Sequence, residues 1–91
     1  MNKPWASACE DTEKVAKDFE LVLNREGHRF NYTGEAGNCV VTIWAKEEAP
    51  RYCATVLAYD VEPEFGRSFQ TFNISSLIEI INLLVRARSE S

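Results

Sequence analysis

The chain has 91 residues, which is enough for one small domain and excludes two-domain enzymes and large doubly wound sheets. Hydrophobic residues make up 45% and charged residues 26% of it, the balance of an ordinary globular protein, so bulk disorder is excluded. Ten Lys and Arg against 14 Asp and Glu give a net charge of −4. This charge argues against direct binding to nucleic acid or to an anionic membrane, because both require clustered positive charge.

The three cysteines, Cys9, Cys39 and Cys53, are odd in number and widely spaced. This pattern is not that of a disulfide framework, and no C-x-x-C motif is present. The first residues carry no apolar run, so the sequence predicts neither a signal peptide nor a transmembrane segment. We therefore expect reduced thiols and a cytoplasmic protein.

The N-terminal third has the pattern of an amphipathic helix. Ser7 and Glu10 have the spacing of a capping box, and Gly27 is a residue type that ends helices. Apolar residues recur between them at helical spacing, at Val15, Phe19, Val22 and Leu23. The sequence predicts a helix over 8–26 after a flexible segment at 1–6.

The pattern then alternates with a period of two, which is typical of strands. Strands are predicted over 28–33, Cys39–Lys46 and Arg51–Tyr59. The turns between them, 34–37 and 47–50, are too short for crossover connections, so the strands form an antiparallel meander.

Four-residue loops at both turns determine the expected register. Residues that lie opposite each other share a face of the sheet. The expected opposite pairs are Phe30 with Val41, Tyr32 with Cys39, Ile43 with Ala54, and Val41 with Val56. The predicted core face therefore contains Phe30, Tyr32, Cys39, Val41 and Ile43.

The last third is expected to contain an irregular acidic loop at 60–68 and a short extended piece at 69–72. A second capping-box pattern, Ser76 to Glu79, precedes apolar residues at helical spacing and predicts the last helix. The chain over 1–91 is thus predicted to be one α+β domain. It consists of a helix, a three-stranded antiparallel meander with a possible short fourth strand, and a helix, with both helices on one face.

Chemistry-bearing residues are sparse. His28 is the only histidine, and no nucleophile or orienting acid lies near it in sequence, so we expect no catalytic residue. One histidine and three scattered cysteines do not form a recognisable zinc pattern, so we expect neither a metal site nor a cofactor. Cys9 is the one cysteine expected near a helix N-terminus, where a thiol pKa can fall; the others are expected to be buried.

The element order helix, three strands, helix resembles that of the double-stranded-RNA-binding domain. That resemblance implies RNA contacts from basic residues at the start of the last helix. The corresponding residues here, 75–79, include no lysine or arginine, so the RNA-binding function is only a low-ranking alternative. In size, charge and element order the chain is also similar to small acidic phage inhibitors, including anti-CRISPR proteins, which implies an inhibitor that binds a protein.

The face of the sheet opposite the helices is the most informative feature. Val40 and Trp44 are predicted to point away from the helices, together with Cys53, Leu57 and Tyr59. An apolar surface of this kind marks an interaction site. Two explanations stay open: the surface docks a partner, or it is covered by the segment with Trp5 or by the loop with Phe65 and Phe69.

We therefore expect a small acidic, non-catalytic module that binds a protein with a basic surface, such as a nucleic-acid-handling protein, and inhibits or regulates it. A homodimer formed through the outer face or through edge strands is the alternative, and an enzyme ranks lower. The residues expected to bind the partner are Val40, Trp44, Leu57, Tyr59, Glu47, Glu48, Asp60, Glu62 and Glu64.

Overall fold

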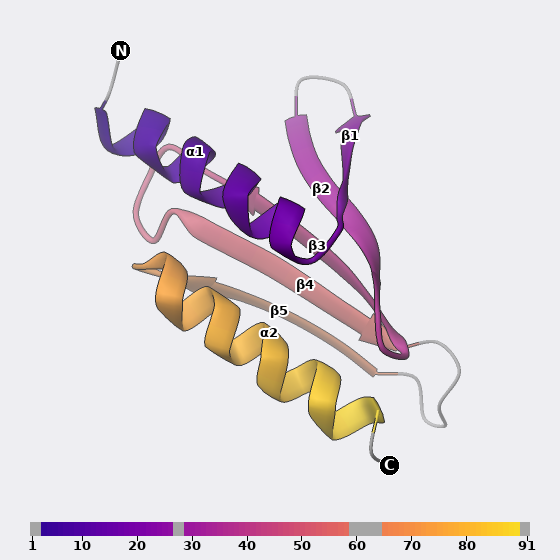
Figure 1. Cartoon of the computed structure of the whole chain (residues 1–91). Coiled ribbons are helices and arrows are strands. Elements are labelled where there is room, and N and C mark those ends of the chain that lie inside the picture. The colour runs from indigo at the N-terminus through magenta and orange to yellow at the C-terminus, as the bar shows by residue number, and fades with distance from the viewer. Residues whose placement is uncertain (1–2, 27–28, 59–64, 90–91) are drawn as a thin grey trace.

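The computed structural model describes residues 3–26, 29–58 and 65–89. The elements in chain order are α1 (Lys3–Asp18), β1 (Val22–Glu26), β2 (Arg29–Ala36), β3 (Cys39–Ala45), β4 (Tyr52–Ala58), β5 (Phe65–Thr71) and α2 (Ile74–Ser89). The strands form one antiparallel sheet in the order β1-β2-β3-β4-β5, so each strand pairs with the next (Figure 1). The α+β class is confirmed, although the meander has five strands instead of three.

Both helices pack on one face of this sheet, as expected. α1 lies over β2 and β3, and α2 lies over β4 and its neighbours (Figure 1). The core between the layers contains buried side chains from both helices and from β3 and β4, namely Val15, Ala16, Val41, Ile43, Ala54, Val56, Leu77 and Ile81. One helix is too narrow to cover the whole face, so α1 covers β2 and β3 and α2 covers β3, β4 and β5.

The first helix begins and ends earlier than predicted. It starts at Lys3, so Ser7 and Glu10 lie inside it and 3–6 do not form a separate flexible segment. It ends in a Schellman motif, in which the Leu21 N–H donates to the Ala16 carbonyl at 2.7 Å and the Glu20 N–H to the Lys17 carbonyl at 3.1 Å. Glu20 has φ 58°, the left-handed conformation that glycine usually supplies.

Residues 22–26 are therefore the strand β1 and not the end of a helix. Val22 and Leu23 matched the helical spacing of the preceding apolar residues, but the chain reverses at Glu20 before reaching them. β1 then pairs with β2 with Asn24 opposite Asn31. Gly27, which we expected to end the helix, lies outside the described residues.

The hairpin between β2 and β3 is tighter than predicted. Its loop is Gly37-Asn38, with Ala36 opposite Cys39, and Gly37 has φ 60°. A positive φ at the first loop position is the type II′ pattern, which favours glycine. Tyr32 therefore lies opposite Ile43 instead of Cys39. The shift is an even number of residues, so Tyr32 still faces the helices.

The hairpin between β3 and β4 has the predicted register. Ile43 lies opposite Ala54 and Val41 lies opposite Val56, and all four side chains are fully buried. The turn is closed by the Lys46 N–H, which donates to the Arg51 carbonyl at 2.9 Å.

The C-terminal part differs from the prediction at two points. Residues 65–71 form a complete strand, so the irregular segment does not extend to 68. α2 begins at Ile74, and Asn73 is its N-cap, because the Asn73 Oδ1 accepts the Ser76 N–H at 2.8 Å. The predicted capping box at Ser76 therefore lies within the first turn of α2.

Two contacts fix α1 against the sheet. The Tyr52 hydroxyl on β4 donates to the Asp11 carboxylate on α1 at 2.9 Å. Gly34 on β2 allows the chain after α1 to approach, because a Cβ there would lie 3.0 Å from Leu21 Cδ2 and 3.4 Å from Leu21 Cα. A side chain at position 34 would therefore push the α1–β1 connection away from the sheet.

Replacement of Glu20 by glycine is predicted to stabilise the fold by about 0.5–1 kcal/mol, because glycine adopts a positive φ without the steric cost that a Cβ imposes. Urea unfolding followed by circular dichroism measures the change. Glu20→Ala is the matched control, since it removes the charge but keeps the Cβ. An equal gain for Glu20→Ala would show that the carboxylate and not the backbone causes the strain.

Tyr52→Phe is predicted to cost about 1 kcal/mol at pH 7 through loss of the bond to Asp11. Burial, followed by the bond to Asp11 and its charge, raises the pKa of Tyr52 above the usual value near 10. The folded state thus holds this proton more tightly than the unfolded state, so the stabilisation is complete below pH ~10 and is lost as pH rises through the folded pKa.

Unfolding curves of the two proteins between pH 7 and 11 should therefore converge at the alkaline end. The pKa of Tyr32 is also raised, chiefly by burial, and it contributes equally to both proteins. A stability difference that stays constant across this pH range would contradict the assignment.

Candidate functional site: the outer face of the sheet

The face of the sheet opposite the helices, called here the outer face, is crossed by a row of small hydroxyl side chains. Thr33, Thr42, Thr55 and Ser68 lie opposite one another on four successive strands. Hydroxyl groups of Thr33 and Thr42 are hydrogen-bonded at 3.0 Å, and those of Thr55 and Ser68 at 3.1 Å. These bonds hold the short side chains close to the strands, so the row forms a flat polar surface.

Apolar side chains lie on both sides of this hydroxyl row. Val40 and Leu57 are opposite each other on one side, and Trp44 lies on the other, next to Cys53. Val40, Trp44 and Leu57 are partly exposed, whereas Cys53 is only 1% exposed. The structure thus brings together on one face three of the apolar residues that the sequence indicated.

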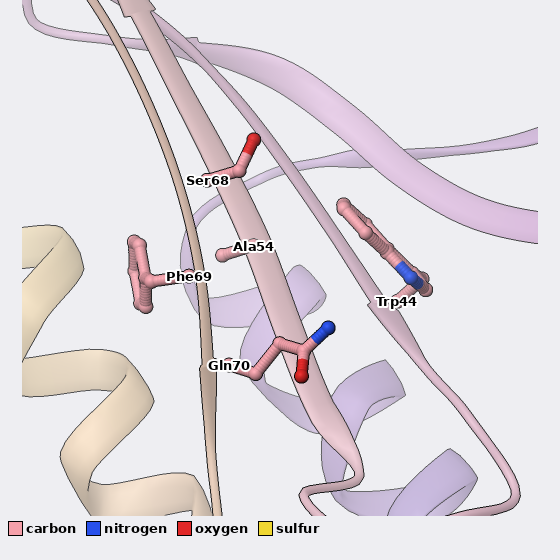
Figure 2. A pocket seen from close by; sticks show the side chains of 5 residues that line it. All are labelled: Trp44, Ala54, Ser68, Phe69 and Gln70. Atoms are coloured by element: carbon pink, nitrogen blue, oxygen red, sulfur yellow. The ribbon is translucent and has the colours of Figure 1, made fainter.

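A shallow hollow of about 330 Å³ lies beside Trp44, lined also by Ala54, Ser68, Phe69 and Gln70. Figure 2 shows that Trp44, Ser68 and Gln70 project from one side of the sheet, whereas Phe69 projects from the other side toward α2. The hollow therefore opens on the outer face, between the indole on β3 and the polar edge strand β5.

Cys53 lies on the outer face, on the same side of the hydroxyl row as Trp44. It lies between Trp44 and Gln70 on the neighbouring strands, and the Lys46 Nζ donates to the Gln70 Oε1 at 3.1 Å. Burial raises the pKa of the Cys53 thiol, and the nearby Lys46 charge opposes that rise. A protonated, covered thiol contributes packing to this face and is a poor nucleophile.

The described parts of the two candidate covers do not lie on the outer face, and residues 59–64 lie outside the described residues. Trp5 is part of α1, which packs on the inner face, and Phe69 packs against the core. Within 3–26, 29–58 and 65–89 no helix lies on the outer side of the sheet (Figure 1). The partial exposure of Trp44, Val40 and Leu57 is therefore a property of the described fold.

Acidic side chains flank the outer face. Glu47 and Glu48 are exposed in the turn between β3 and β4, near Trp44. At the opposite end Glu35 is exposed on the outer face, directly across from Val40. The other four residues expected to bind the partner lie outside the described residues: Tyr59, Asp60, Glu62 and Glu64.

The sequence analysis missed the polar part of this face. Thr33 and Glu35 were assigned to a strand end and a turn, and Ser68 to a loop. The alternation of side chains between the two faces continues from the predicted strand through Gly34 to Ala36, and this continuation was the available signal for a longer strand. The two glycines at 34 and 37 obscured it, because glycine usually indicates a turn.

Other classes of site are not indicated by the described residues. Where side chains are described, no three His, Cys, Asp or Glu residues lie close enough together to hold a metal ion. Burial raises the pKa of Cys9 as well, contrary to the lowering that a helix N-terminus can cause; Cys9 lies in the second turn of α1. None of the described helices is long and apolar enough to cross a membrane.

Comparisons with models of protein families, with curated proteins and with solved structures found no match to this chain. The resemblance to the double-stranded-RNA-binding domain rested on a three-stranded sheet, and the sheet here has five strands. The start of α2 contains Ser75 and Ser76, without a basic residue in its first two turns.

Native labelling of the thiols tests the packing of the outer face. An excess of a maleimide, followed by mass spectrometry, should modify Cys9 well before Cys39 and Cys53, because only Cys9 is partly exposed. Gln70→Ala should increase the labelling rate of Cys53 several-fold and leave that of Cys39 unchanged, because Gln70 lies beside Cys53 only. Equal labelling of Cys53 in both proteins would show that Gln70 does not cover it.

Proposed function

We propose that this protein is a small, non-catalytic protein-binding module that docks a partner on the outer face of its sheet. The observation that carries the proposal is the partial exposure of Trp44, Val40 and Leu57 on a face that no described helix covers. Exposed apolar surface gathered on one face of a domain is typical of an interaction site.

The composition of the outer face suits a protein partner. Tryptophan is among the residue types that contribute most binding energy at interfaces. The hydroxyl row between Trp44 and Leu57 supplies hydrogen-bonding groups without bulk, so a flat surface of mixed polarity results. Interfaces that form between independently folded proteins have this mixed character.

The charge favours a partner with a basic surface. Glu35, Glu47 and Glu48 are exposed at the two ends of the outer face, and the whole chain carries a net charge of −4. Such a surface attracts a basic protein over a long range and competes with phosphates for its cationic groups. We propose inhibition or regulation of a nucleic-acid-handling protein, as an anti-CRISPR-like or other anti-defence protein would perform it.

Compartment and oligomeric state belong to the same proposal. The three cysteines are not joined by disulfide bonds, and two of them are buried as thiols, which suits a reducing compartment such as the cytoplasm. The outer face could also bind a second copy of the chain. Sedimentation of the purified protein with and without Trp44→Ala separates that alternative from a hetero-complex.

Affinity capture followed by calorimetry with the purified partner tests the proposal. Trp44→Ala is predicted to weaken binding about 30-fold or more, the effect of losing a central aromatic anchor. Leu83→Ala is the matched control, because Leu83 is an equally apolar, 58% exposed residue on α2, away from the outer face. Binding should also weaken as NaCl rises from about 50 to 500 mM, because salt screens the acidic surface.

Wild-type affinity for Trp44→Ala, with native circular dichroism, would contradict docking on the outer face. An affinity that does not change with salt would contradict only the choice of a basic partner.

A further inference from the structure

Two cationic side chains lie together at the end of the outer face where Trp44 is found. The Lys46 N–H donates to the Arg51 carbonyl at 2.9 Å and continues the register of β3 with β4 by one pair, so Lys46 and Arg51 are opposite each other. Residues that lie opposite each other share a face of the sheet. That face is the outer one, because the Lys46 ammonium donates to Gln70, which projects from the same side as Trp44 (Figure 2).

No carboxylate balances these two charges. Among the described residues neither Lys46 nor Arg51 forms an ion pair, although Glu47 and Glu48 stand between them in the turn. The two glutamates are exposed, whereas Lys46 and Arg51 are partly buried, so solvent screens the two cations less. Like charges directly opposite each other destabilise a strand pair, and a negative charge placed between them removes that cost.

The Arg51 guanidinium also has an unused donor. Its Nε is buried and has no hydrogen-bond partner among the described residues. Nearly all buried polar groups in folded proteins are paired, and an unpaired one indicates a partner such as an ion that the chain itself does not supply. An oxyanion provides the acceptor and the negative charge together, and arginine can bind it with two parallel hydrogen bonds.

The hollow beside Trp44 adjoins the two cations. Gln70 lines the hollow and accepts the hydrogen bond from the Lys46 Nζ at 3.1 Å, so the ammonium lies at the rim. The indole of Trp44 forms one wall, on the other side of β4 from Gln70 (Figure 2). The volume of about 330 Å³ is at the lower end of the range for small-molecule sites. An aromatic wall next to two cations suits a ligand that combines an aromatic ring with an anion.

The charge at the rim selects the class of anion. A phosphate monoester carries a charge of about −1.5 to −2 at pH 7 and three acceptor oxygens, which matches two cations better than a single carboxylate does. Nucleobases are aromatic rings that stack on tryptophan whatever their identity. The Gln70 Oε1 is bonded to Lys46, which leaves the amide N–H groups of Gln70 to donate to the ring nitrogens of a base.

We infer that this end of the outer face binds a nucleoside monophosphate. The phosphate lies between Lys46 and Arg51, and the base stacks on the indole of Trp44 beside Gln70. One nucleotide needs only these two cations. A polynucleotide carries a phosphate on every residue, and the net charge of −4 opposes its binding.

Calorimetric titration of the purified protein with AMP tests the inference. The wild type should bind AMP with a Kd of about 0.1–1 mM, and adenosine, which lacks the phosphate, should bind at least ~tenfold more weakly. In a Trp5→Phe background Trp44 is the only tryptophan. AMP should quench its fluorescence there, because the base stacks on the indole.

Two independent variants test the phosphate contacts. Lys46→Gln and Arg51→Gln should each weaken AMP binding about tenfold, the effect of losing one charge-assisted contact. Arg86→Gln is the matched control, since it removes one exposed cation from α2, which packs on the inner face. It should keep the wild-type affinity. Circular dichroism of each variant identifies any loss of the native fold, and either variant alone is sufficient for the test.

Three results would overturn the inference. The first is no binding of AMP by the wild type up to about 5 mM, and the second is binding of adenosine as tight as that of AMP. The third is equal weakening by Arg86→Gln, which would show attraction by overall charge and not a site.

Phenyl phosphate distinguishes a nucleotide from other aromatic phosphates, because its ring has no nitrogen to accept from Gln70. Binding of phenyl phosphate as tight as that of AMP would overturn the choice of a nucleotide. All these measurements use the protein without a protein partner, so their outcome is independent of whether the outer face docks one.

Discussion

The structure depends on the burial of one face of β3 and β4 under two helices. Side chains alternate along these strands, so Val41 and Ile43 reach the helices while Val40 and Trp44 cannot. The inner residues are fully buried, and burial of such side chains is the largest favourable contribution to the stability of a small domain. The same alternation places the outer residues on a face that neither helix covers, so the burial of the core and the partial exposure of Trp44 have a single cause.

The remaining features of the fold bring the helices onto that face. The left-handed Glu20 turns the chain sharply after α1 so that Leu21 packs toward the sheet, and Gly34 leaves the space that this approach requires. The bond from Tyr52 to Asp11 fixes α1 over the strands, and the Asn73 cap starts α2 directly after β5. These contacts involve few residues, but each one stands at a connection where the direction of the chain is decided.

The two surfaces that the helices leave open have different characters. The outer face combines Trp44 and Leu57 with a floor of bonded hydroxyl groups, which suits a folded partner with a matching surface. At β1, the first strand of the sheet, two apolar side chains are exposed, those of Val22 and Leu23.

Local sequence was sufficient for the class of fold, for the faces of the central strands and for the register of β3 with β4, because alternation and a short turn restrict pairing to few solutions. It did not locate the ends of α1. Val22 and Leu23 fit a helical spacing, and only the position of the sheet makes a reversal at Glu20 favourable.

The sequence by itself determined that Trp44 and Ile43 point to opposite sides, since that follows from their adjacency in a strand. Only the tertiary structure decided that the chain reverses at Glu20, that Phe69 packs inward, and that β1 is an edge. These outcomes depend on contacts between segments far apart in the chain, and no local pattern specifies which surfaces such contacts bury.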